Sequence, residues 1–550
     1  MLAMRWLCGG FLFAVGTVAA LNDAPQRPLA GGSNAERRPR TFDAAFTEYL
    51  EKIAEHYHIS SLVAAMVDGE ETFLKAWGTA ILPDVPTTED TLYYVGSTTK
   101  SFTATSLLAV LDDLQHQESR SEPVTLQTRI SSIIPDDFVL PDTYATAHAT
   151  IEDALAHRLG FIGHDLCYGG PNYTVRDVVR ALRHLPMAEE LRAKFQYLNI
   201  GYMIVQHVVE TLTGKFIGDV HKERIWDPLG MDSTFITLDD ALASEKPFAH
   251  GYSWNPFNKT QGHQPWTDTT LVGGGGIITS IKDFGKYLHA LVHRKLPLPG
   301  DLQDELFKPR MIVGSKGVSD HMSDMLYGLG WDVTSYRGHR LIQHSGEISG
   351  FSSNIVFLPE KKFGLAMMIN ADDNGGIANN VLCLYLLERF LEIPEEDWED
   401  IVPHWDEVER AKLDFFLHAR DILYPGVPSP PIPPSLPLGE YAGTYSHPAY
   451  REITLELREP RAGLPLAKHT KEVLHTDIRR LVNVTVDLEH VSGEFFAAWT
   501  DLEVTAPFVR GAVPAQFEIG SDGKVQKMGL QFEIGHQSQD KESLVWFDKL

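Results

Sequence analysis

The chain has 550 residues, of which 43% are hydrophobic and 22% are charged, and its formal net charge is −26. This length predicts two domains, and this composition excludes a disordered or fibrous chain. Because so acidic a protein repels phosphate groups, nucleic acid and anionic membrane surfaces are excluded as expected partners, and we interpret the charge as the surface of a soluble secreted protein.

The first twenty residues predict a signal peptide. One positive charge precedes the apolar run LCGGFLFAVGTVAA, and Val18 and Ala20 fit a small-residue cleavage pattern. A signal anchor is the alternative interpretation, but the run is short and no later stretch reaches about 18 apolar residues, so we expect no membrane span in the mature chain. Residues 21–41 are polar with scattered Pro and Gly, which predicts a disordered leader.

Cysteines and sequons also bear on the compartment. Cys8 is removed with the signal peptide, so the mature chain keeps Cys167 and Cys383. These two form no C-x-x-C pair, and the sequence leaves open whether they form a disulfide. Together with the signal, three sequons predict a secreted glycoprotein; they begin at Asn172, Asn258 and Asn483.

The first half of the chain alternates between strand and helix signals. Residues 44–57 predict an amphipathic helix, and residues 61–80 predict two strands joined by the Asp68-Gly69 turn. A helix over 102–114 is expected to bury one face. The middle of the chain is rich in helical periodicity, as in YTVRDVVRALRHL and YMIVQHVVETLTGKFI.

Strand signals return beyond residue 320, in LYGLGWDVT, HRLIQHS, SSNIVFLP and FGLAMMINA. Strands at both ends of a helical middle predict an antiparallel sheet that the N- and C-terminal segments close together. A further helix over 405–422 precedes the proline run YPGVPSPPIPPSLPLG, which predicts a stiff, extended linker over 424–438. The alternating segments after it predict a small antiparallel β domain over 439–550.

A Ser-x-x-Lys pair lies in YVGSTTKSFTA, where Ser97 and Lys100 follow a strand-like approach and a glycine. At the start of a helix, the backbone N–H groups favour developing negative charge beside the serine, and the lysine shares its face. The same residues also fit a helix cap followed by an exposed lysine. The spacing alone is weak evidence, because it recurs at Ser521–Lys524 and Ser538–Lys541 in the β region.

Two further motifs favour the catalytic interpretation. Tyr197-Leu-Asn199 is the only Tyr-x-Asn in the chain and opens a helical run, and His344-Ser345-Gly346 ends a predicted strand. In this order, the three motifs resemble those of the serine β-lactamase and penicillin-binding-protein family. With histidine in the third motif, the chain is most similar to class C β-lactamases, D-alanyl-D-alanine carboxypeptidases and their esterase and aminopeptidase relatives.

Other strings extend the resemblance over about residues 42–400: LAHRLGF, DPLGMDST, GGGGIITSIKDFGKY and YGLGW. The resemblance implies an α+β fold of the β-lactamase/transpeptidase type, an antiparallel sheet flanked by helices with a helical subdomain, in a catalytic domain over 42–423. The C-terminal β domain resembles the lipocalin-like domains appended to many relatives.

The resemblance also implies roles for the motif residues. Ser97 is the expected nucleophile, and either Lys100 or Tyr197 removes its proton. Asn199 is expected to bond Lys100 and a substrate amide, while the backbone N–H groups of Ser97 and Glu347 are expected to form an oxyanion hole. No metal or cofactor is predicted. His157, His164 and Asp165 lack a defined ligand spacing, and GGGG at 273–276 is not followed by the residues of a phosphate-binding loop.

His344 departs from the lysine that relatives acting on penicillins carry in the third motif. Its charge is expected to be conditional, because its ordinary pKa is about 6.5. The prediction is therefore a secreted serine hydrolase for esters, amides or D-residue peptides, acting on a small-molecule or peptide substrate through an acyl-enzyme. Two alternatives are an acyltransferase that uses the same serine and a non-catalytic binding module on this scaffold.

Overall fold

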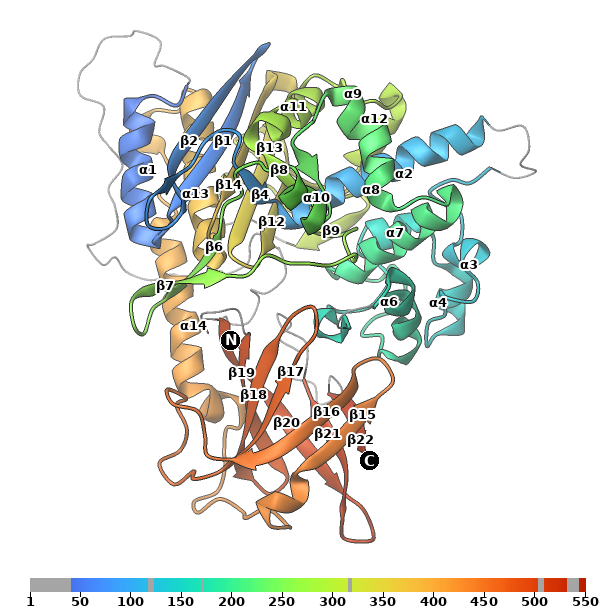
Figure 1. Cartoon of the computed structure of the whole chain (residues 1–550), viewed down its shortest axis with the longest axis vertical. Coiled ribbons are helices and arrows are strands. Elements are labelled where there is room, and N and C mark those ends of the chain that lie inside the picture. Colours follow the sequence, from blue (N-terminus) through green and yellow to red (C-terminus); the bar gives the residue numbers. More distant parts are fainter. Residues whose placement is uncertain (1–40, 117–122, 170–172, 315–318, 503–508, 532–543) are drawn as a thin grey trace.

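A computed structural model describes residues 41–116, 123–169, 173–314, 319–502, 509–531 and 544–550. The predicted signal peptide, the leader up to residue 40, Asn172 and the Ser538–Lys541 pair lie outside these residues. A larger mixed domain stands above a β-barrel, and the long helix α14 (Val402–Leu423) runs between them (Figure 1).

A nine-stranded sheet is the centre of the larger domain. Its order is β3-β2-β1-β14-β13-β12-β11-β10-β9, and each pair is antiparallel. The prediction that both ends of the chain close the sheet is confirmed, because β1 pairs with β14 and Leu62 lies opposite Ile369. The strands are β1 Ser61–Asp68, β2 Glu71–Ile81, β3 Val85–Pro86, β9 Met311–Gly314, β10 Met325–Tyr327, β11 Asp332–Tyr336, β12 His339–Ile348, β13 Phe351–Leu358 and β14 Phe363–Ile369.

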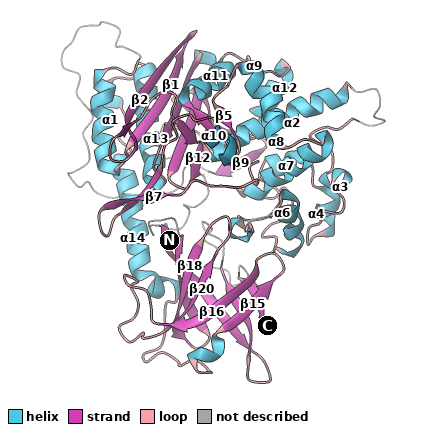
Figure 2. Cartoon of the chain, in the orientation of Figure 1, coloured by secondary structure: helices cyan, strands magenta, loops and turns pink. Residues whose placement is uncertain are grey.

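Helices cover both faces of this sheet (Figure 2). Because side chains alternate along a strand, Leu62, Ala64 and Met66 of β1 pack in one core with α1 (Ala44–Tyr57) and α13 (Asp373–Phe390). The alternate residues of β1 pack in a second core, with α2 (Thr99–Gln115) and α11 (Ile281–Val292); they are Val63, Ala65 and Val67. A strand buried on both faces explains why β1 is apolar throughout.

A helical region flanks the second core. Its helices are α3 Ile130–Ile133, α4 Thr143–His148, α5 Ile151–Leu155, α6 Val175–Ala181, α7 Asn199–Thr213, α8 Ile217–His221, α9 Asp227–Leu229, α10 Leu238–Ala243 and α12 Gly300–Leu306. Two small sheets accompany them, formed by β4 Leu92–Tyr94, β5 Thr234–Phe235 and β8 Ile278–Ser280, and by β6 Gly251–Asn255 and β7 Thr260–Gln264.

Two sequence predictions were wrong in detail. LYGLGWDVT is two strands, because Gly328 to Trp331 form a turn between β10 and β11 in which Gly328 N–H bonds Trp331 O. The helix after Ser97 is buried nearly all round instead of on one face. Its polar residues, such as Thr103, are paired inside; Thr103 Oγ1 donates to Gly273 O at 2.7 Å.

The C-terminal β domain is a closed antiparallel barrel of eight strands, which bears out the predicted lipocalin-like architecture. Its strands are β15 Gly443–His447, β16 Arg451–Arg458, β17 Val473–Ile478, β18 Val484–Ser492, β19 Phe495–Leu502, β20 Val509–Ile519, β21 Val525–Leu530 and β22 Val545–Lys549. The proline-rich segment before the barrel lies along it, since Ile432 N–H bonds Ser492 Oγ. Within the described part of the chain, no helix is long and apolar enough to cross a membrane.

Candidate active site

Ser97 lies in the tight connection between β4 and α2. Residues Gly96–Thr98 form one 3₁₀ turn, and α2 begins immediately after it at Thr99. Gly96 has φ +51°, and a Cβ on it would lie 2.6 Å from Glu347 N, so only glycine fits this turn. The turn holds Ser97 at the start of a buried helix with 8% of its surface exposed.

Lys100 lies directly beside the serine. Its Nζ donates to Ser97 Oγ at 2.9 Å and to Gly274 O at 2.8 Å, and the side chain is fully buried. The start of α2 has no side-chain cap, so the alternative of a capping serine and an exposed lysine is wrong. Close backbone packing explains the glycine run, because a Cβ on Gly273 would lie 2.5 Å from Tyr202 O.

The Tyr-x-Asn motif meets the same lysine. Lys100 Nζ lies 4.9 Å from the centroid of the Tyr197 ring. Asn199 begins α7, and its Nδ2 donates to Asp165 Oδ2 at 3.0 Å. Since a carboxylate only accepts hydrogen bonds, this contact determines which way the Asn199 amide is turned. Asp165, which the sequence analysis considered only as a metal ligand and set aside, therefore belongs to the candidate site.

The third motif closes the site through its backbone. Gly346 lies against the turn of Ser97, because a Cβ on Gly346 would lie 2.0 Å from Val95 O and 2.9 Å from Ser97 N. Ser353, which pairs with Gly346 across β12 and β13, donates from Oγ to Val95 O at 2.7 Å. The backbone N–H groups of Ser97 and Glu347, the expected oxyanion donors, thus belong to one tightly packed junction.

The Glu347 side chain points away from this junction toward the start of α13, where its carboxyl lies close to Gly376. Burial raises the pKa of Glu347, and the neighbouring Asp373 raises it further. The backbone of Glu347 therefore lies beside the turn of Ser97, while its side chain packs against the start of α13.

A chain of buried hydrogen bonds connects the motifs. Leu198 N–H donates to His157 Nδ1 at 2.9 Å, so the proton of His157 is on Nε2, which donates to Tyr327 Oη at 3.2 Å. The Tyr327 hydroxyl then donates to His344 Nε2, also at 3.2 Å. His344 Nδ1 is 2.5 Å from Ser345 O, a carbonyl that can only accept. Each ring thus carries one proton at a defined nitrogen.

This arrangement keeps His344 neutral. Burial lowers the pKa of His344 to about 3, with a further contribution from the positive charge of Lys100. Burial, Lys100 and His344 also hold the pKa of His157 well below its ordinary value. The charge expected of His344 thus stays conditional, and the lowered pKa favours the uncharged ring at neutral pH.

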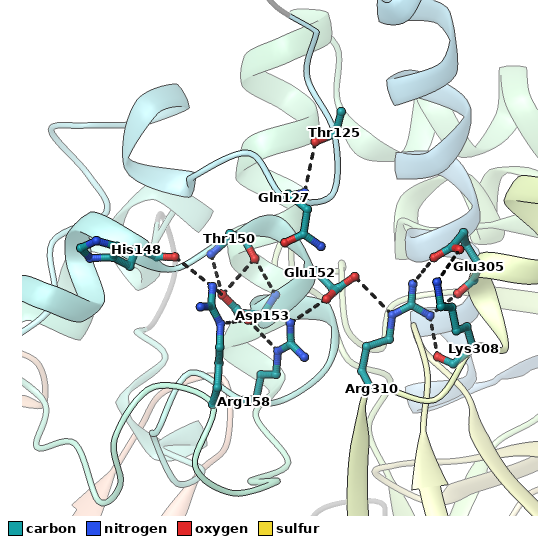
Figure 3. A network of polar contacts seen from close by, with 11 residues as sticks. Thr125, Gln127, His148, Thr150, Glu152, Asp153, Arg158, Glu305, Lys308 and Arg310 are labelled. Carbon is teal, nitrogen blue, oxygen red and sulfur yellow. Dashed lines mark hydrogen bonds and ion pairs between the residues drawn. The ribbon is translucent and has the colours of Figure 1, made fainter.

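A second polar network holds the chain segments that carry these residues (Figure 3). Asp153 of α5 accepts from Arg158 Nε at 2.6 Å and from Arg192 Nη2 at 2.7 Å, which joins the segment before Tyr197 to the end of α5. The side chain of Arg310 donates from Nε to Glu152. The backbone N–H of Arg310 donates to the backbone carbonyl oxygen of Tyr327 at 2.7 Å. The network therefore positions the two ends of the His157–Tyr327 hydrogen bond.

The remaining predicted features lie elsewhere. Ser521 and Lys524 lie in the barrel, in the turn between β20 and β21, and not in the domain that contains the candidate site. Asn258 lies in the exposed β6–β7 turn, and Asn483 is half-buried just before β18. Cys167 and Cys383 are both buried free thiols. Trp331, the last residue of the YGLGW string, is fully buried and belongs to the core.

Among the described residues, one group has the spacing of metal ligands: Glu70, His289 and His293, with ligand atoms within 4.8 Å of one another. Lys362 Nζ lies 3.5 Å and Lys295 Nζ 3.9 Å from oxygens of the Glu70 carboxylate. Because two ammonium groups compete with a cation for this carboxylate, the group is not a convincing metal site.

Comparison with known proteins adds the family. Residues 42–381 match the family model described as Beta-lactamase, and residues 427–545 match a domain of unknown function (DUF3471). The unguisins hydrolase ungD′ of Aspergillus campestris is 33% identical over 91% of each chain. A D-aminopeptidase of Brucella anthropi is 23% identical over 60% of each chain.

A solved structure resembles the fold of this chain over most of its length. The octameric penicillin-binding protein homologue from Pyrococcus abyssi covers 92% of this chain and 99% of its own, with a TM-score of 0.55 and 18% identity. At this identity the likeness concerns the fold alone.

Proposed function

The chain is a serine hydrolase that belongs to the β-lactamase family, and on this premise we propose that it cleaves amide bonds in peptides that contain D-residues and lack a free carboxylate at the binding position. Unguisins are the first candidates, because the relative that matches over most of both chains is named for their hydrolysis. The similarity to a D-aminopeptidase supports a substrate that contains a D-residue.

The observation that carries the substrate class is the burial of His344 and its contacts with the Tyr327 hydroxyl and Ser345 O. A cation next to the third motif would favour a substrate carboxylate, but His344 is buried between the Tyr327 hydroxyl and Ser345 O, and this burial lowers its pKa to about 3. Without that cation, a neutral amide is favoured over a carboxylate-bearing β-lactam at the same place. The substrate is therefore a peptide whose recognised end carries no charge.

The proposed first step is acylation of Ser97. Ser97 Oγ forms a bond to the substrate carbonyl carbon while its proton passes to the pair of Lys100 and Tyr197, since Lys100 Nζ already contacts Oγ at 2.9 Å. The backbone N–H groups of Ser97 and Glu347 receive the charge that develops on the carbonyl oxygen. The C–N bond then breaks, and the leaving amine takes the proton from the same pair.

The second step reverses these roles with water as the nucleophile. The Lys100–Tyr197 pair takes a proton from water, the new C–O bond forms, and Ser97 leaves with its proton restored. Release of a free acid distinguishes this hydrolysis from transfer of the acyl group to another amine or alcohol.

The proposal includes the secretory route. It is supported by the charged and apolar segments of residues 1–20 and by the sequon at Asn258, which lies in an exposed turn. Expression in a eukaryotic host tests it. Protein in the medium with an N-terminus near residue 21 supports secretion, whereas retention with residues 1–20 intact contradicts it.

The central experiment compares Ser97→Ala with Ser521→Ala. Wild type and Ser521→Ala are expected to hydrolyse an unguisin and a D-residue peptide amide, while Ser97→Ala loses this activity, because the decoy Ser-x-x-Lys pair is outside the site. Mass spectrometry should find a fluorophosphonate adduct on Ser97. Unchanged turnover by Ser97→Ala, or rapid nitrocefin hydrolysis by the wild type, would overturn the proposal.

A further inference from the structure

The turn from His164 to Tyr168 lies between the active site and the barrel. It contains the short 3₁₀ turn Asp165–Cys167, and His164, Leu166 and Cys167 are buried in it. In Figure 1 the barrel lies directly below this part of the larger domain. One residue of the turn, Asp165, accepts the hydrogen bond of Asn199.

The barrel holds the residues on either side of Asp165. Tyr450, in the turn between β15 and β16, brings its hydroxyl 2.7 Å from His164 Nδ1, and both side chains are fully buried. Arg480, between β17 and β18, donates from Nη1 to Leu166 O at 3.4 Å. Two different hairpin turns of the barrel thus contact the immediate neighbours of Asp165.

The Tyr450 turn is itself well defined. His447 Nδ1 lies 3.1 Å from Ala449 N and 3.2 Å from Tyr450 N, and accepts both N–H groups. The Tyr450 ring also packs against Phe547 of β22, with 5.9 Å between ring centroids. The hydroxyl therefore reaches His164 from a rigid support, as a positioning contact requires.

On the site side, the Asp165 carboxylate is shared between two donors. Tyr168 Oη donates to Oδ1 at 2.6 Å, and Asn199 Nδ2 donates to Oδ2 at 3.0 Å. Because the carboxylate takes the amide nitrogen, the carbonyl oxygen of Asn199 is the atom presented to N–H donors. A small rotation of Asp165 changes the direction of that oxygen.

From these contacts we infer that the barrel is part of the catalytic apparatus: Tyr450 and Arg480 are positioning residues that hold Asp165, and through it Asn199, in the orientation that receives a substrate amide. This inference rests on the proposed function, since Asn199 is assigned there to substrate recognition. The barrel then determines selectivity for substrates with an amide next to the scissile bond.

The test uses Tyr450→Phe, with Tyr445→Phe as the matched control. Tyr445 is also a fully buried barrel tyrosine, but its hydroxyl donates to Tyr441 O within the barrel. Two esters are compared: the p-nitrophenyl esters of N-acetyl-D-phenylalanine and of 3-phenylpropionic acid, which differ by one acetamido group.

Tyr450→Phe is expected to lower kcat/KM for the acetamido ester by about three- to tenfold, which corresponds to one hydrogen bond, and to leave the plain ester within about twofold. Tyr445→Phe should change neither. An equal loss for both esters, or no loss for either, overturns the inference, because a merely structural contact has no reason to distinguish them.

A double-mutant cycle with Asp165→Ala tests the path of the effect. If Tyr450 acts through Asp165, Tyr450→Phe has no further effect on acetamido selectivity in the Asp165→Ala background; additive losses overturn the proposed path. Failure of the proposed function can be distinguished from failure of this inference, because in the first case the wild type turns over neither ester. In that case the cycle is measured on the rate at which Ser97 is labelled by fluorophosphonates with and without an acetamido group.

Discussion

Tyr327 is the residue on which the hydrogen-bond chain beneath the active site depends, and Tyr327→Phe removes one oxygen atom from it. The hydroxyl accepts from His157 Nε2 and donates to His344 Nε2, at 3.2 Å in each case. Phenylalanine keeps the buried ring but leaves one ring N–H without an acceptor and one ring nitrogen without a donor. Both histidines are almost completely buried, so water does not replace the lost partner.

The expected cost follows from these two orphaned groups. An unsatisfied buried polar group costs about 1–3 kcal/mol, so two cost about 2–6 kcal/mol. Removing the hydroxyl also removes its own desolvation penalty, which offsets part of this loss. We therefore expect Tyr327→Phe to lower the free energy of unfolding of the larger domain by about 2–4 kcal/mol.

Urea unfolding at pH 7.5 measures this change, with Tyr287→Phe as the control. Tyr287 is also fully buried, but its hydroxyl neighbours keep other partners without it: Ser101 Oγ, at 3.2 Å, still donates to Thr98 O, and Thr105 Oγ1 still donates to Ser101 O. The control is expected to lose only about 0.5–1.5 kcal/mol. If the two variants agree within about 0.5 kcal/mol, less than one typical hydrogen bond, the proposed chain of hydrogen bonds is wrong.

Three further predictions test other parts of the structure. Lys100→Met should lower kcat about 10²- to 10⁴-fold while the fold is retained, because it removes the amine that contacts Ser97 Oγ. Steady-state kinetics measure the loss, and circular dichroism checks the fold. A loss below tenfold contradicts a role of Lys100 in proton transfer. Gly346→Ala should abolish activity, because its Cβ would lie 2.0 Å from Val95 O, whereas Gly439→Ala, whose Cβ has no neighbour nearer than 3.9 Å, should be neutral in the same assay. Burial lowers the pKa of His221 to about 3, so its contribution to stability is complete above its unfolded pKa of about 6.5 and is lost as pH falls toward 3. Between pH 7.5 and 4.5 the wild type should therefore lose about 3 kcal/mol more unfolding free energy than His221→Gln, measured in urea, and parallel pH profiles would refute this.

Much of the fold was predictable from local pattern. The alternation and the Asp68-Gly69 turn indicated the β1–β2 hairpin, and the helix over 44–57 appears as α1. The barrel was indicated by short alternating segments after a proline run. These features are readable because side-chain period and turn chemistry are properties of a few neighbouring residues.

The errors have a common physical origin. LYGLGWDVT contains an apolar run of the right length for one strand, but Gly328 and Trp331 close a turn that packs against Leu306, whose carbonyl accepts from Leu329 N–H. The helix after Ser97 was expected to bury one face, but Thr99 and Thr103 on it find partners in other elements, so it is buried nearly all round. Both outcomes depend on neighbours that are distant in the sequence.

The sequence by itself determined the chemistry available to this protein: a Ser-x-x-Lys pair, a unique Tyr-x-Asn and a His-Ser-Gly, in an order that resembles one family. Only the tertiary structure decided how these residues are arranged. It brought Lys100 to Ser97, directed Asn199 toward Asp165, and buried His344 beside Tyr327, where burial lowers the pKa of its ring. The physical reason is that the residue type sets the possible protonation states of a side chain. Burial and partners that are distant in the sequence determine which of these states is favoured.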